Sequence, residues 1–225
     1  MNAPPRTVEQ VDRPALTRDE LAGQIAADIP AGAYVNLGIG WPTAVADHLD
    51  PDAGVVLHTE NGMLGMGPAA TNGDIDPDLI NAGKIPVTEL AGASYFHHAD
   101  SFAMMRGGHL DVAVMGAYQV SQDGDLANWH TGNADDIPAV GGAMDLAVGA
   151  RAVFVMMSLF TKTGEPKLVP KCSYPLTGLR CVTRVYTELA TFEVTAEGLR
   201  VLRTFGVSIA SLQNRLEVPL HRGTP

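Results

Sequence analysis

The chain has 225 residues, of which 46% are hydrophobic and 18% are charged, so it can bury a sizeable core and suits one large domain. Its formal net charge of −10, from 15 basic and 25 acidic residues, argues against a nucleic-acid surface and an anionic membrane surface. It leaves an anionic substrate open, because a local site can be positive on an acidic protein. No apolar run approaches ~20 residues, so no transmembrane helix is expected.

The N-terminal region and the cysteines indicate the compartment. Residues 1–15 lack the apolar segment of a signal peptide and contain three prolines, so we expect a flexible arm before one α/β domain over residues 16–225. Cys172 and Cys181 form no CxxC motif. This usage is typical of a reducing, cytoplasmic environment, in which both thiols serve as small buried hydrophobes.

Strand and helix signals alternate through the first half of the chain. Thr17 to Glu20 match a capping box, and the turn Gly38 to Thr43 joins a strand to a helix, although the third glycine of a dinucleotide fingerprint is missing. Helices are predicted over residues 18–29, 42–49, 102–106, 141–150 and 208–216, with a short helix ending within 79–84 at Gly83. Strands are predicted over residues 34–37, 55–57, 86–90, 111–115, 153–157, 182–186, 190–194 and 199–204, with turns at 91–96 and 121–124.

The order of these elements predicts the fold class. Strands that alternate with helices are typical of a parallel sheet, whereas the last three strands follow one another without helices. We therefore predict an α/β fold: an open, mostly parallel sheet flanked by helices, with an antiparallel C-terminal extension.

Glu60 is the first candidate for chemistry. The strand over residues 55–57 runs into a segment with glycines at 62, 65 and 67, which we interpret as a glycine-rich loop. Ligands of open α/β sheets bind at such strand ends. An arbitrary loop glutamate more often caps a turn or pairs with a base. A reactive carboxylate with no neighbouring histidine or metal has two roles open to it, general base or nucleophile.

Few other residues carry chemistry. Lys84 is a candidate anion partner, and the amides of Gly141 and Gly142, at a predicted helix start, are candidate oxyanion donors. The histidines lack metal-site spacing, and the alternating aspartates from Asp74 to Asp78 lack the glycine and terminal glutamate of a calcium loop, so no metal is expected. From the residues alone, the best hypothesis is an enzyme that acts on a carbonyl or acyl group.

Eight segments, in order along nearly the whole chain from Leu16, resemble the B (β) subunit of family I CoA-transferases. The stretches Asn128–Gly132 and Phe154–Met157 most resemble the members that act on 3-oxoadipate. The eight segments are Asn36–Thr43, Glu60–Pro68, Asp78–Lys84, Gly92–Phe96, Ser101–His109, Gly124–Trp129, Gly141–Leu146 and Tyr174–Gly178.

The resemblance implies transfer of CoA from succinyl-CoA to 3-oxoadipate through a glutamyl-CoA thioester on Glu60. It implies an oxyanion-stabilising amide at Gly141 or Gly142 and a CoA contact at Lys84. Further residues implied to shape the turn or bind substrate are Asn61, Gly62, Gly38 and Gly40. CoA and succinyl-CoA would be substrates, with no permanently bound cofactor. An A (α) subunit would complete an A2B2 heterotetramer, so the chain alone is expected to be inactive.

One departure from the family pattern concerns substrate fit. Ser158-Leu159-Phe160 stands where relatives often carry an acidic residue and a histidine. Three alternatives to the 3-oxoadipate enzyme stay open: a transferase for acetoacetate or another 3-oxoacid, an acyl-CoA-binding protein without turnover, and a CoA hydrolase.

Overall fold

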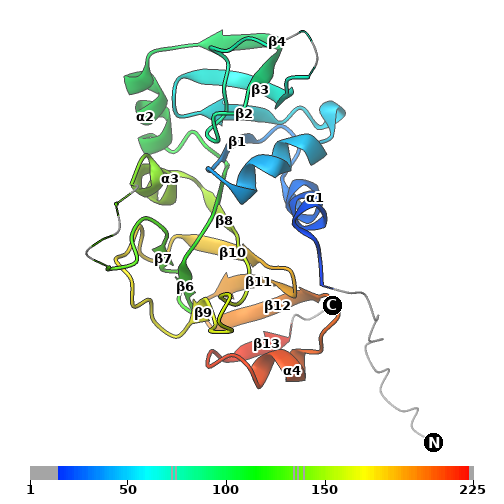
Figure 1. The fold of residues 1–225 in the computed structure, drawn as a ribbon, viewed down its shortest axis with the longest axis vertical. Helices are drawn as coiled ribbons and strands as arrows, with labels where there is room; N and C mark the ends of the chain where they lie inside the picture. The colour runs from blue at the N-terminus through cyan, green and yellow to red at the C-terminus, as the bar shows by residue number, and fades with distance from the viewer. Residues whose placement is uncertain are drawn as a thin grey trace, which may run out of the picture.

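The computed structural model describes residues 15–71, 73, 75–133, 135, 137–138 and 140–222. The predicted N-terminal arm, apart from Ala15, and Asp74 lie outside these residues. A ten-stranded sheet runs through the molecule in the order β13-β12-β11-β10-β8-β5-β1-β2-β3-β4 (Figure 1). No helix in the described part of the chain is long and apolar enough to cross a membrane.

The centre of the sheet is parallel, as predicted. Each of its neighbouring pairs from β10 to β2 runs in the same direction. These strands are short and rich in apolar residues, as expected where both faces of a parallel sheet are covered. They are β1 (Tyr34–Leu37), β2 (Val56–Thr59), β5 (Val112–Met115), β8 (Ala152–Met156) and β10 (Val182–Tyr186).

Two apolar clusters lie on opposite faces of these strands. Along β5, Ala113 and Met115 join one cluster, whereas Val112 and Val114 join the other. Strand β8 divides in the same way, because successive side chains of a strand point to opposite faces. Helices α2 (His98–Arg106) and α3 (Ala143–Gly149) cover one face, and α1 (Arg18–Asp28) covers the other (Figure 1).

Antiparallel pairs flank the parallel centre of the sheet on both sides. At the C-terminal edge, β11 (Ala190–Thr195) and β12 (Gly198–Thr204) confirm the predicted extension. A short strand that was not predicted, β13 (Leu220–Arg222), pairs parallel with β12. Helix α4 (Ile209–Gln213) ends before β13 and is shorter than the helix predicted over residues 208–216.

At the opposite edge, the prediction of a glycine-rich loop was wrong, because these residues form a strand. Strand β3 (Met63–Ala69) pairs antiparallel with β2 and with the nine-residue β4 (Val87–Tyr95). The glycines serve close packing: a Cβ on Gly65 would lie 3.1 Å from Ala93 Cα, and the pairing register of β3 and β4 shifts there.

Two predicted boundaries near β4 were wrong. Residues 79–84 form no helix; Asn81 Oδ1 accepts from the amides of Gly83 and Ile85 and closes a turn. Residues 91–95 continue β4, and α2 begins earlier than predicted because His97 Nδ1 accepts from the Ala99 amide as its cap. Side-chain caps of this kind compete with the backbone patterns that sequence periodicity reports.

The remaining elements surround this framework. Helix α1 begins at the predicted capping box, and the predicted helix at 42–49 is the 3₁₀ helix η1 (Trp41–His48), followed by η2 (Pro51–Ala53). A small second sheet has the order β7-β6-β9. It joins the predicted hairpin of β6 (Gln119–Ser121) and β7 (Leu126–Ala127) to β9 (Leu168–Val169).

Candidate active site

A tight turn at the end of β2 presents Glu60. The Gly62 amide donates to Thr59 O at 3.1 Å, and the Met63 amide donates to Thr59 Oγ1 at 3.1 Å. Glu60 and Asn61 therefore occupy the two central positions of the turn between β2 and β3. Parallel strands β1 and β5 end at the same edge of the sheet, so the turn projects over their carboxyl ends.

Gly62 is required by this turn. Its φ is +114°, a conformation that favours glycine, and a Cβ at this position would collide with the carbonyl oxygen of Phe96. The Phe96 amide also donates to Gly62 O at 3.0 Å. The chain leaving β4 is thus in direct contact with the turn and fixes it from behind.

The Glu60 carboxylate lies against the start of α3. The Gly142 amide donates to Glu60 Oε2 at 3.1 Å, and a Cβ on Gly142 would lie 2.5 Å from the same oxygen. Burial raises the pKa of Glu60 above its ordinary value of 4.5, and the negative charge of Asp145 adds to the increase. The Gly142 hydrogen bond and the nearby His98 oppose this rise in pKa.

Behind the turn lies a polar network that the sequence analysis missed. Asn36 Nδ2 lies 3.2 Å from His58 Nδ1 and donates to His58 O, also at 3.2 Å. Because an amide nitrogen only donates, His58 Nδ1 accepts and the ring proton lies on Nε2. Nε2 then donates to Ser101 Oγ at 3.0 Å, and Ser101 Oγ donates to Thr59 O at 3.1 Å.

The network anchors the end of β2 around a neutral His58. Burial lowers the pKa of His58 to about 4, so the imidazole carries no charge near neutral pH. Asn36 and His58 lie opposite each other on β1 and β2. The signal available in the sequence was a polar residue in the second half of each of these two short strands. Asn36 is 2% exposed, and its Oδ1 has no hydrogen-bond partner among the described residues.

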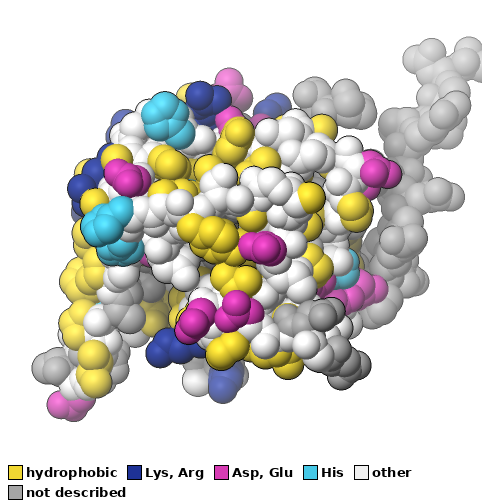
Figure 2. Space-filling model, turned by 90° about the horizontal axis from the view of Figure 1, so that it is seen from above, with side chains coloured by type: hydrophobic (Ala, Val, Ile, Leu, Met, Phe, Trp, Pro, Cys, Tyr) yellow, Lys and Arg dark blue, Asp and Glu magenta, His cyan; other side chains and the backbone are white. Residues whose placement is uncertain are grey.

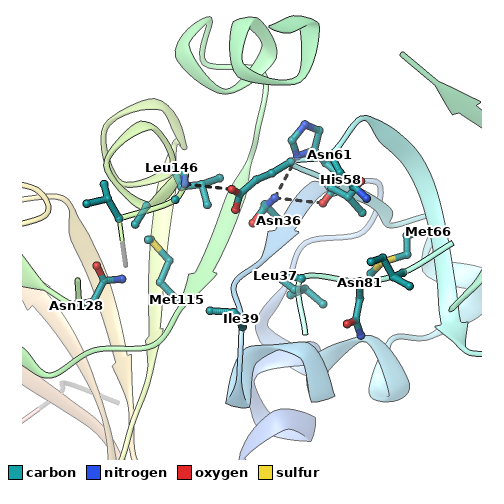
Figure 3. Close-up of a pocket in the computed structure, with 18 residues that line it drawn as sticks. Asn36, Leu37, Ile39, His58, Asn61, Met66, Asn81, Met115, Asn128 and Leu146 are labelled. Atoms are coloured by element: carbon teal, nitrogen blue, oxygen red, sulfur yellow. Dashed lines mark hydrogen bonds between the residues drawn. The ribbon is translucent and has the colours of Figure 1, made fainter. Parts of the chain in front are cut away.

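A cavity of about 460 Å³ opens at this edge of the sheet. In Figure 3, Met115 and Asn128 lie on one side of it, Met66 and Asn81 lie on the other, and Ile39 lies between them. The cavity brings together four of the predicted site residues: Glu60, Asn61, Gly141 and Gly142.

The other predicted residues lie outside this lining. Lys84 is exposed on the turn after Asn81 and Ala82, which do line the cavity. Gly38 serves close packing, since its amide donates to Val114 O at 2.8 Å and a Cβ would lie 3.1 Å from that oxygen. Gly40, at φ +89°, precedes η1 and lines a neighbouring cavity of about 420 Å³.

The described residues offer a carboxylate and amides as site chemistry, with no group of three or more His, Cys, Asp or Glu side chains among them that could hold a metal. A half-buried carboxylate next to a backbone donor can act on an electrophilic carbon at the cavity. The geometry alone allows both attack by Glu60 and proton abstraction by it.

Comparison with known proteins identifies the family. Residues 18–204 match the family model described as Coenzyme A transferase. The chain is 64% identical to the B subunit of 3-oxoadipate CoA-transferase from Pseudomonas putida over 206 residues, covering 91% of this chain and 96% of that protein. It is 58% identical to the B subunit of the enzyme of the same name from Acinetobacter baylyi over 199 residues, covering 88% and 92%.

A solved structure supports the fold. The acyl-CoA transferase YdiF of Escherichia coli O157:H7 matches with a TM-score of 0.70 at 17% identity. The match covers 96% of this chain and 43% of that longer chain. Fold, family model and sequence identity agree, and this chain belongs to the Coenzyme A transferase family.

Proposed function

We propose that this chain is the B (β) subunit of an enzyme that moves CoA from succinyl-CoA to 3-oxoadipate, with Glu60 as the nucleophile. The observation that carries the proposal is the position of Glu60, on a tight turn at the cavity with its carboxylate held by the Gly142 amide at 3.1 Å. The relative at 64% identity, whose name specifies 3-oxoadipate, supports the choice of substrate.

In the first half-reaction, a Glu60 oxygen attacks the thioester carbonyl of succinyl-CoA. The carbon–sulfur bond breaks, leaving a mixed anhydride on Glu60 and a CoA thiolate. The thiolate then attacks the Glu60 carbonyl and releases succinate, so that CoA is joined to Glu60 as a thioester. In the second half-reaction, a carboxylate oxygen of 3-oxoadipate attacks this thioester, and the same steps in reverse produce 3-oxoadipyl-CoA and free Glu60.

The environment of Glu60 suits this reaction. A carboxylate is ionised at neutral pH and needs no general base, but it is a weak nucleophile. Burial raises the pKa of Glu60, which makes the carboxylate more basic and so a better nucleophile. Fixing it against the thioester would supply most of the rate, since favourable intramolecular geometry is worth roughly 7–11 kcal/mol.

The Gly142 amide has two partners in this proposal. In the resting site it donates to Glu60. When Glu60 is acylated its negative charge is lost, and the amide can then donate to the oxyanion that develops on the reacting carbonyl. The neighbouring Gly141, which lines the same cavity, is a second candidate donor.

The rest of the active site would come from an A (α) subunit. The names of both relatives specify a B subunit, which supports a partner chain, and we propose an A2B2 arrangement for the two subunits. Exposed apolar side chains at the β4 edge, Ile85, Leu90 and Tyr95, provide a surface that a partner can cover. Seen from this end, hydrophobic side chains reach the surface between acidic ones (Figure 2). CoA would enter as substrate, with Lys84 at the edge of the cavity as a contact.

The cellular compartment proposed is the cytoplasm. Cys172 and Cys181 are free thiols of intermediate exposure, and burial raises the pKa of each to about 11. Such thiols are unreactive and suit a reducing environment.

The test is mass spectrometry of the complex of both subunits after incubation with succinyl-CoA. The peptide that contains Glu60 should gain the mass of CoA less one water, and the exposed Glu165→Gln variant should be labelled at the same site. Glu60→Gln should abolish both the label and the transfer of CoA. Unmodified Glu60 during turnover, or transfer by Glu60→Ala at the normal rate, would exclude Glu60 as the nucleophile. Side-by-side kcat/KM values for 3-oxoadipate and acetoacetate decide the substrate.

A further inference from the structure

The second cavity, next to that of Glu60, contains a lysine for which the steps above provide no role. Lys167 lines this cavity of about 420 Å³ together with Trp41, Tyr118 and Ser158. It is the one charged residue among the described residues of the lining. The lining of the cavity therefore carries a single positive group, on a chain of net charge −10.

The backbone of Lys167 is fixed on both sides. Its amide donates to Leu159 O at 2.9 Å, and its carbonyl accepts from the Val120 amide at 2.9 Å. These bonds tie the residue before β9 to β6 and to the segment that follows β8. That segment contains Ser158 and Leu159.

The Lys167 ammonium has no ion-pair partner within the described ranges of the chain. Glu188 is close enough to attract it, but Glu188 Oε2 accepts from the Leu159 amide at 2.9 Å. Burial nevertheless lowers the pKa of Lys167. A partly buried ammonium without a direct anionic partner is costly unless a ligand supplies one.

The two cavities are neighbours. Ile39 and Asn128 line both of them. Asn128 is held in place, since its Nδ2 donates to Gly116 O at 3.1 Å and its Oδ1 accepts from Thr177 Oγ1 at 2.6 Å. Glu60 and Lys167 therefore line adjoining cavities that share the fixed Asn128 side chain.

We propose that Lys167 and the second cavity form the subsite for the terminal carboxylate of a dicarboxylic acyl group. This inference rests on the proposed function, in which both the succinyl group and 3-oxoadipate carry a carboxylate at the end remote from the reacting carbon. The flexible four-carbon stem of a lysine can follow a carboxylate at two chain lengths, which suits one subsite for both acids. A 3-oxoacid that ends in a methyl group has no use for the cation.

The test compares 3-oxoadipate with 3-oxohexanoate, which has the same number of carbons but a terminal methyl group. In a ping-pong reaction, kcat/KM for the acceptor depends only on the second half-reaction. Any effect of a variant on the first half-reaction, with succinyl-CoA, therefore does not change this value. In the complex of both subunits, Lys167→Met should lower kcat/KM for 3-oxoadipate by roughly 10- to 100-fold, as expected for loss of a charge-assisted hydrogen bond. The value for 3-oxohexanoate should stay unchanged or rise.

Two further variants separate recognition from structure. Lys162→Met, on the exposed part of the same segment, should change neither value, and Lys167→Arg should retain most of the preference for 3-oxoadipate. An equal loss for both acceptors in Lys167→Met, or no loss for either, would overturn the inference.

A binding measurement keeps this result distinct from the proposed function. By calorimetry, adipate should bind the wild-type complex, and its Kd should rise at least about tenfold in Lys167→Met, whereas hexanoate should bind both alike. If the wild-type complex transfers no CoA, the proposed function fails, and adipate binding still decides the role of Lys167. Equal adipate affinity in the two proteins would remove the subsite.

Discussion

The hydrogen bond between Gly142 and Glu60 predicts a large effect of one methyl group. In Gly142→Ala the added Cβ would lie 2.5 Å from Glu60 Oε2, 2.9 Å from Glu60 Cδ and 3.3 Å from Phe102 Cζ. The carboxylate is the easiest of these groups to move, so it should leave the amide. The φ of Gly142 is −88°, which alanine adopts without strain, so the substitution acts on the contact and not on the backbone.

The expected loss of rate follows from what the amide does before and during the reaction. An oxyanion donor is worth about 2.7–4 kcal/mol in kcat. An interaction accelerates the reaction only by the amount by which it is stronger in the transition state than in the ground state. In the ground state the Gly142 amide already donates to the Glu60 carboxylate, and such a hydrogen bond to a charged group is worth about 1.5–3 kcal/mol. The surplus is then on the order of 1 kcal/mol, and displacement of Glu60 adds to it. The rate should fall by about tenfold at least, and by about 10³-fold if the amide acts mainly on the oxyanion.

The assay is the single-turnover rate of thioester formation on Glu60 in the complex of both subunits, with the folded fraction checked by circular dichroism. Gly141→Ala is the comparison. Nothing lies within 4 Å of its added Cβ, but its φ of +48° strains alanine by about 1–2 kcal/mol. Gly141→Ala should therefore lower the free energy of unfolding, and Gly142→Ala should lower the rate far more. A folded Gly142→Ala complex with the wild-type rate would refute the reasoning.

Three more outcomes are expected from the site. The attacking group is the carboxylate, so kcat/KM for succinyl-CoA should be high above the raised pKa of Glu60 and fall as the pH drops through it. Asp145→Asn removes a negative charge that raises this pKa, so the acid limb of the pH profile should move to lower pH. An acid limb that stays in place would contradict the assignment. Ser101→Ala leaves the buried His58 N–H without its acceptor and should cost about 1–3 kcal/mol of unfolding free energy, measured by urea denaturation. Gly62→Ala should abolish thioester formation because its Cβ meets the Phe96 carbonyl, whereas Gly164→Ala, at a similar positive φ with open space, should stay active; equal activity of the two would show that the collision is relieved elsewhere.

The parts of the fold that the sequence predicted are those in which one local signal decides. The central parallel strands are short apolar runs, and the start of α1 has both halves of its capping box. Strand β3 was missed because its glycines were interpreted as a loop signal. Those glycines are needed because β4 packs close to them, and β4 lies more than twenty residues away in the chain.

In the site, too, local patterns could predict single residues but not the contacts between residues that are distant in the chain. Glu60 and Gly142 could each be proposed from local patterns, but they are 82 residues apart, and nothing local indicates the bond between them. The network of Asn36, His58 and Ser101 joins β1, β2 and α2, so it depends on the order of strands in the sheet. The position of Lys167 beside the cavity depends on the small second sheet, which sequence periodicity predicted only in part.

The side-chain pair of Asn36 and His58 makes activity depend on how two strands are aligned. These residues are Cα partners in the β1–β2 ladder, and Glu60 lies two residues after His58 in the chain. If β1 slipped by one residue against β2, Asn36 would point to the opposite face of the sheet and the imidazole would lose its donor. A chain misaligned in this way could still bury its valines and leucines. Such a chain would be compact but inactive. The hydrogen bond between the Asn36 amide and the His58 imidazole therefore distinguishes the correctly paired strands from a misaligned pair.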